Sequence, residues 1–111
     1  MLFRLPKDTK EIHWTKHIKE KMRQYQLSER RILRVFRNPE RKEIGVAPET
    51  ICAMQTAGTK KHPYEIWVMY QKKGKKLIMI SAWKYPGKSP IREPPPIPEE
   101  ILENLDEILK E

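Results

Sequence analysis

The chain has 111 residues, enough for one domain with one modest core. Its 23 lysines and arginines outnumber 15 acidic residues, which gives a net charge of +8. No run of about 18 apolar residues is present, so the sequence excludes a membrane-spanning helix and predicts no membrane partner. A single cysteine, Cys52, excludes an internal disulfide and a cysteine-based zinc site, and favours a reducing, cytoplasmic setting.

The first helix is predicted over residues 15–26, where apolar residues recur at helical spacing after Thr15, a suitable N-cap. A second helix is predicted over residues 29–37, capped by Ser28 and ended by Asn38-Pro39. Residues 10–14, before the first helix, fit either a short strand or an irregular lead-in.

The middle of the chain has the alternation of β-strands. Strands are predicted at residues 43–47, 50–57, 64–71 and 77–83, and the last is apolar enough to be covered on both faces. Alternation along this last strand places Leu77, Met79, Ser81, Trp83 and Tyr85 on one face, and Ile78, Ile80, Ala82 and Lys84 on the other. Lys84 and Tyr85 are therefore expected to point in opposite directions.

The C-terminal part contains a proline-rich stretch and an acidic amphipathic segment. Residues 86–98 are predicted to form an extended arm, and residues 99–111 an amphipathic helix. The predicted fold class is α+β: two N-terminal helices packed on a three- to four-stranded antiparallel sheet, followed by the arm and the helix. Residues 1–85 are expected to form the α+β domain, and residues 86–98 and 99–111 to belong to the same structural unit.

Charge is divided unevenly between these parts. Residues 98–111 have one lysine and six carboxylates, a net charge of −5, so residues 1–97 carry +13. A body this basic attracts polyanions, and RNA is the partner that the sequence favours. A solvated lysine and arginine surface is the alternative.

Four short motifs carry a family resemblance: Thr15-Lys16-His17, Met22-Arg23, Leu27-Ser28 and Asn38-Pro39. Together with the order of the predicted elements, these motifs make residues 10–85 similar to the RelE/ParE/BrnT-like toxin superfamily. The closer resemblance is to an uncharacterised branch of that superfamily. The resemblance implies a compact α+β domain and, in many members, metal-independent RNA cleavage. It also implies an antitoxin protein as partner, and RNA on the ribosome as a target.

Three residues are candidates for catalysis if that activity is present: His17, Lys84 and Tyr85. His17 suits a general base or acid because its pKa lies near neutrality, and its alternative role is to tie a helix to a strand. The resemblance implies that Lys84 stabilises a phosphate and that Tyr85 stacks on a base or acts as a general acid. The alternative is that both are surface residues at a strand end without a functional role. His13 and His17 have metal-ligand spacing but no third ligand, so neither a metal nor a cofactor is predicted.

The nucleic-acid-binding candidates are basic residues of the two helices and of one turn: Arg23, Arg30, Arg34, Arg37, Lys72, Lys73, Lys75 and Lys76. Three hypotheses remain open. The first is an RNA-directed toxin-like protein acting as a metal-independent endoribonuclease. The second is a non-catalytic module that binds nucleic acid or protein. The third is a protein-interaction adaptor centred on the C-terminal helix, without affinity for nucleic acid. The acidic C-terminal helix is expected to dock on its own domain. The alternatives are homodimer formation, competition with RNA on the basic face, and binding of a partner protein such as an antitoxin.

Overall fold

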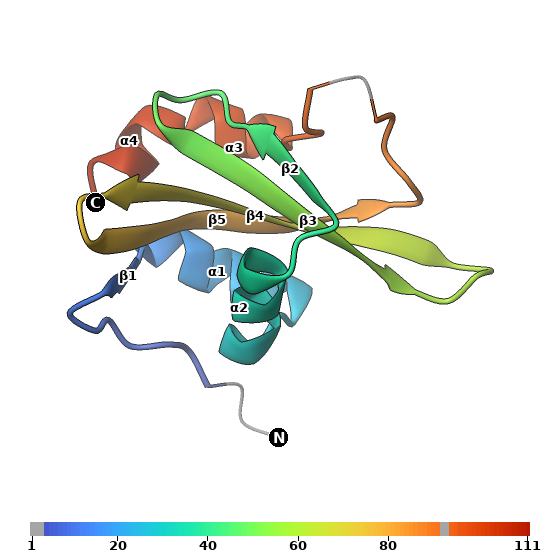
Figure 1. The fold of residues 1–111 in the computed structure, drawn as a ribbon, viewed down its shortest axis with the longest axis horizontal. Helices are drawn as coiled ribbons and strands as arrows, with labels where there is room; N and C mark the ends of the chain where they lie inside the picture. Colours follow the sequence, from blue (N-terminus) through green and yellow to red (C-terminus); the bar gives the residue numbers. More distant parts are fainter. Residues whose placement is uncertain (1–3, 92–93) are drawn as a thin grey trace.

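A computed structural model describes residues 4–91 and 94–111, and within them the chain forms a five-stranded sheet with helices on both faces (Figure 1). The helices α1 (Lys16–Tyr25) and α2 (Glu29–Arg37) lie on one face. The shorter helices α3 (Glu99–Glu103) and α4 (Leu105–Leu109) lie on the other. The α+β class is confirmed. No helix in the described part of the chain is long and apolar enough to cross a membrane.

The two N-terminal helices begin where the capping residues predict. The Thr15 hydroxyl accepts a hydrogen bond from the Ile18 N–H at 3.0 Å, and the Ser28 hydroxyl accepts one from the Arg31 N–H at 3.1 Å. These bonds satisfy amides that have no partner inside a helix. Gln26, in the left-handed region at φ 56°, ends α1 and allows the sharp turn into α2.

The sheet has five strands in the order β1-β5-β4-β3-β2, so the prediction of three or four antiparallel strands is wrong in this detail. Strands β2 (Arg41–Ile44), β3 (Thr50–Gly58), β4 (Pro63–Lys73) and β5 (Lys76–Pro86) form an antiparallel meander. The additional strand is β1 (Ile12–Trp14), which pairs parallel to β5. Its partner lies more than 60 residues away along the chain, and local patterning cannot reveal such a pairing.

A β-bulge in β5 corrects the predicted assignment of side chains to faces. Met69 pairs with Ser81 and Tyr70 pairs with Met79, which leaves one extra residue, Ile80, in β5. After the bulge, Trp83 shares a face with Ile80 and not with Met79. The prediction that Trp83 and Tyr85 lie on the face of Leu77 and Met79 is therefore wrong. Lys84 and Tyr85 still point oppositely, as predicted.

The sheet separates two apolar cores. One lies under α1 and α2 and includes Trp14, Ile18 and Ile32; the other, under α3 and α4, includes Trp67 and Trp83. Ile101 and Ile108 are buried in the second core, so the C-terminal segment docks on its own sheet. The predicted single helix is interrupted at Asn104, whose side-chain amide donates to the Glu100 carbonyl at 2.7 Å.

Candidate nucleic-acid interface

His17 ties α1 to β5. Its Nε2 lies 2.8 Å from the Ser81 hydroxyl, and its ring is half-buried. Burial, and then the Lys21 charge, lower the pKa of His17 below its usual value. The shallow depression beside it is lined by Lys16, His17, Glu20, Asn104, Glu107, Ile108 and Glu111. Three of these side chains are carboxylates, which repel a phosphate.

His13 faces a different partner. Its Nδ1 lies 2.5 Å from a carboxylate oxygen of Asp8, whereas His17 contacts Ser81. Within residues 4–91 and 94–111, no group of three histidine, cysteine or acidic side chains is placed to hold a metal ion. Cys52 is buried, and burial raises the pKa of its thiol to about 12, as expected of a structural cysteine.

The three predicted catalytic residues occupy three different places. Tyr85 packs against the core under α3 and α4. Lys84 lies on the opposite face, where its Nζ is 5.0 Å from the centroid of the Tyr64 ring. His17 contacts β5 through Ser81 and borders the acidic depression. The structure therefore does not bring His17, Lys84 and Tyr85 into one site.

Lys84 instead forms part of a cleft between the α1–α2 junction and the end of the sheet. The cleft is lined by Gln26, Leu27, Ser28, Arg31, Tyr64, Ile66 and Lys84. Local structure fixes this arrangement, because Leu27 is buried and Ser28 caps α2 directly beside Arg31. The pairing of Ile66 with Lys84 aligns β4 and β5 beneath the junction.

The charges of Arg31 and Lys84 are not neutralised by an ion pair. The Arg31 guanidinium donates to the side-chain oxygen of Gln55, a neutral group. In the described part of the chain, neither cation forms an ion pair with a carboxylate. Burial, and then the neighbouring Arg34, lower the pKa of Arg31. The Glu40 carboxylate acts in the opposite direction on this pKa, but the side chains that line the cleft include two cations and no carboxylate, so the cleft favours anions.

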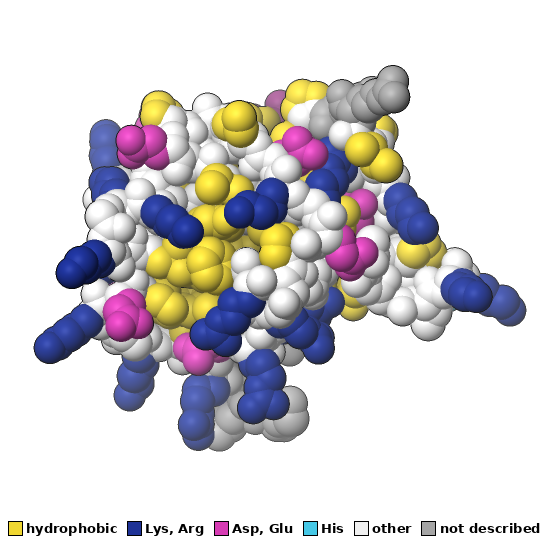
Figure 2. Space-filling view, in the orientation of Figure 1, with side chains coloured by type: hydrophobic (Ala, Val, Ile, Leu, Met, Phe, Trp, Pro, Cys, Tyr) yellow, Lys and Arg dark blue, Asp and Glu magenta, His cyan; other side chains and the backbone are white. Residues whose placement is uncertain are grey.

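The other basic candidates divide between two ends of the molecule. Arg34 is close enough to Arg31 to affect its pKa, and Arg30 and Arg23 lie in the turns of α2 and α1 that flank the junction. The candidates Lys72, Lys73, Lys75 and Lys76 belong to the β4–β5 hairpin, at the opposite end of these strands from Tyr64 and Lys84. Arg37 lies in the last turn of α2. On the face shown in Figure 2, lysine and arginine side chains are spread out and do not form one patch.

Sequence reasoning did not name Tyr64 and Arg31, which line this cleft, as candidate residues. Tyr64 was assigned only to a strand, although its place beside the His62-Pro63 loop puts it at an end of that strand. Arg31 does not share the helical spacing of Arg30, Arg34 and Arg37. Their proximity depends on where β4 meets the α1–α2 junction, so no local pattern in the sequence could have found both.

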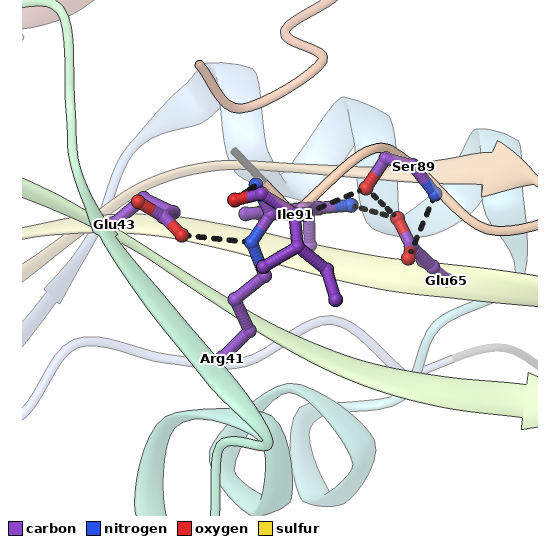
Figure 3. A network of polar contacts seen from close by, with 6 residues as sticks. Arg41, Glu43, Glu65, Ser89 and Ile91 are labelled. Atoms are coloured by element: carbon purple, nitrogen blue, oxygen red, sulfur yellow. Dashed lines mark hydrogen bonds and ion pairs between the residues drawn. The ribbon is translucent and has the colours of Figure 1, made fainter. Parts of the chain in front are cut away.

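A second polar cluster holds the start of the proline-rich arm on the sheet (Figure 3). Glu65, 2% exposed, accepts hydrogen bonds from the Ser89 N–H at 3.1 Å, the Ser89 hydroxyl at 2.6 Å and the Trp67 ring N–H at 2.9 Å. Arg41 donates to the Ser89 hydroxyl at 2.9 Å and to Glu43 at 2.8 Å. These polar groups satisfy one another, so the cluster is structural.

Comparisons of the chain with protein-family models, with curated proteins and with solved structures found no match. The resemblance to the RelE/ParE/BrnT-like superfamily stays a prediction. Geometry and charge are the observations that bear on function, and they direct attention to the cleft of Arg31, Tyr64 and Lys84.

Proposed function

We propose that the protein is a non-catalytic module that binds single-stranded RNA in the cleft between the α1–α2 junction and the sheet. One observation carries the proposal: Lys84 and Arg31, two cations without a carboxylate partner in the described residues, line the same cleft as the Tyr64 ring. Cations that follow a phosphate backbone and aromatic rings that stack on bases are the two components of single-strand recognition.

Each side chain has a distinct role in this proposal. The Arg31 guanidinium donates to a phosphate with its nitrogens that do not bind Gln55. The Lys84 ammonium lies over the Tyr64 ring in the free protein, and a base that stacks there takes its place. Lys84 then moves to the adjacent phosphate. Arg30 and Arg34 extend the positive potential along α2.

The surroundings of the predicted catalytic residues favour binding over cleavage. Cleavage by the ribose 2′-hydroxyl requires a base and an acid beside cations that stabilise the phosphate. His17 has Glu20, Glu107 and Glu111 around it, and Lys84 has no histidine or carboxylate among the residues that line its cleft. The endoribonuclease hypothesis would therefore need a rearrangement that assembles a general base at the cleft.

Binding of a labelled, mixed-sequence RNA of ~12 nucleotides, followed by fluorescence anisotropy over a range of salt, tests the proposal. Lys84→Gln and Arg31→Gln should each weaken binding and lower the salt slope by about 0.7, because each removes one phosphate contact. Tyr64→Leu should cost about 1–3 kcal/mol of binding free energy, because it removes a stacking surface without changing charge.

Lys75→Gln is the matched control, since it removes the same charge at the exposed β4–β5 hairpin. It should change binding much less than Lys84→Gln does. Equal losses from the two substitutions, with no effect of Tyr64→Leu, would show that net charge alone holds the RNA. RNA cut in the presence of EDTA by the wild type, but not by His17→Ala, would replace the binding module with the ribonuclease.

A further inference from the structure

A second hollow adjoins the RNA cleft at the start of α2. Its volume is about 670 Å³, larger than the volume of about 420 Å³ of the cleft. Ser28 lines both spaces, so the two meet at this residue. We call the second space the N-terminal hollow, and it is lined by Arg4, Leu5, Pro6, Lys7, Ser28, Glu29 and Arg30.

Positive charge prevails in the N-terminal hollow. Its lining includes three cations, Arg4, Lys7 and Arg30, and one carboxylate, Glu29, which leaves a net charge of +2. All three cationic side chains are exposed, and none forms an ion pair within residues 4–91 and 94–111. The Ser28 hydroxyl is already used to cap α2. The cations, and not the helix start, therefore supply the attraction for an anion.

Hydrogen bonds fix the N-terminal segment, residues 4–7, that forms one wall of this hollow. One oxygen of the Asp8 carboxylate accepts a hydrogen bond from the Trp14 N–H at 2.8 Å, and the other lies 2.5 Å from the His13 Nδ1. Asp8 thereby anchors the segment to β1, and Pro6 within it is buried (Figure 1). The hollow is therefore formed before a ligand arrives, as binding sites usually are.

We propose that the N-terminal hollow is a second subsite for the same RNA strand, which runs from the cleft across the start of α2. The inference rests on the proposed function, because the cleft holds the first part of the strand. Arg4, Lys7 and Arg30 bind phosphates in the second subsite. Its lining contains no aromatic ring, in contrast to Tyr64 in the cleft. The second subsite therefore holds the backbone and does not select a base.

The length of the RNA separates the two subsites. Fluorescence anisotropy should compare strands of ~4 and ~12 nucleotides, because sites for single strands span this range. The longer strand should bind more tightly, and its salt slope should be steeper by about 2 because three cations are added. The affinity gained by lengthening should therefore fall roughly 20-fold between about 50 and 200 mM salt.

Lys7→Gln tests the hollow by charge. It should lower the salt slope of the longer strand by about 0.7 and leave binding of the shorter strand unchanged. Lys10→Gln is the matched control, because it removes the same charge from an exposed residue of the same segment of chain outside the hollow. It should have a much smaller effect on the longer strand.

Asp8→Ala tests the hollow by position, with an effect opposite to that of net charge. The substitution removes a carboxylate, so simple attraction would strengthen binding of both strands. It also removes the anchor of the N-terminal segment. We expect weaker binding of the longer strand only, and unchanged binding of the shorter strand shows that the variant is folded.

The outcomes distinguish this inference from the proposed function. Equal effects of Lys7→Gln and Lys10→Gln on the longer strand, or its stronger binding by Asp8→Ala, would overturn the second subsite and leave the cleft in place. Inorganic phosphate that abolishes the affinity gained by lengthening, at constant ionic strength, would assign the hollow to a free phosphate instead. Binding of the shorter strand that is insensitive to Lys84→Gln and Tyr64→Leu would overturn the cleft, and the second subsite with it.

Discussion

His17 links the pH dependence of stability to the burial of one imidazole ring. Burial lowers the pKa of His17 from 6.5, so the unfolded chain binds more protons than the folded one below that pH. The contribution of His17 to the free energy of unfolding is therefore at its maximum above pH 6.5. It decreases as the pH falls from 6.5 toward the folded-state pKa. His17→Gln keeps a polar side chain beside Ser81 and should remove this part of the slope, as urea unfolding between pH 5 and 8 can measure.

His62 provides the control for this prediction. It lies exposed in the β3–β4 loop, so His62→Gln removes an imidazole from a solvated position. Because the variant keeps the buried His17, its free energy of unfolding should still fall as the pH drops below 6.5. If His17→Gln retains the same dependence, another group accounts for the slope, and the tie between α1 and β5 has no role in it.

Single residues also show why the candidate site was only partly predictable. Alternation along β5 was sufficient to separate Lys84 from Tyr85, and their opposite directions are confirmed. The partners of Lys84 depend on where β4 and the α1–α2 junction meet, and no local pattern contains that information. The sequence therefore indicated a basic residue for the site without indicating the Tyr64 ring beneath it.

At the scale of elements, substitutions at two adjacent residues of α3 test how the C-terminal segment is held on the sheet. Ile101 is fully buried under the sheet, whereas its neighbour Leu102 is 44% exposed. Ile101→Ala should lower the free energy of unfolding by about 2–5 kcal/mol, because it leaves a cavity in the second core. Leu102→Ala should cost far less. Chemical denaturation of the two variants gives the comparison, and equal costs would contradict the docking described.

Elements with local signals were predicted well, and elements that depend on distant partners were not. The starts of α1 and α2 follow from Thr15 and Ser28, whose side chains act within one helical turn. Strand β1 has three residues and is fixed only by β5. The bulge at Ile80 arises from the fit of β4 against β5, so it shifted the faces of Trp83 and Tyr85 without a signal in the sequence.

The whole molecule separates its charges by position. The acidic helices α3 and α4 cover one face of the sheet, and the cleft with Arg31 and Lys84 opens on the other. The alternative in which the acidic helix competes with RNA at the cleft loses support from this placement. The basic hairpin of Lys72–Lys76 lies at the far end of the sheet, so the two positive ends can be tested separately.

The most direct test of the account is an NMR titration of the ¹⁵N-labelled protein with a short single-stranded RNA. The account predicts that amide shifts concentrate at Leu27, Ser28 and Arg31 on the helix side of the cleft, and at Tyr64 and Lys84 on the strand side. Shifts centred on the Lys72–Lys76 hairpin or around His17, with the cleft unchanged, would contradict it.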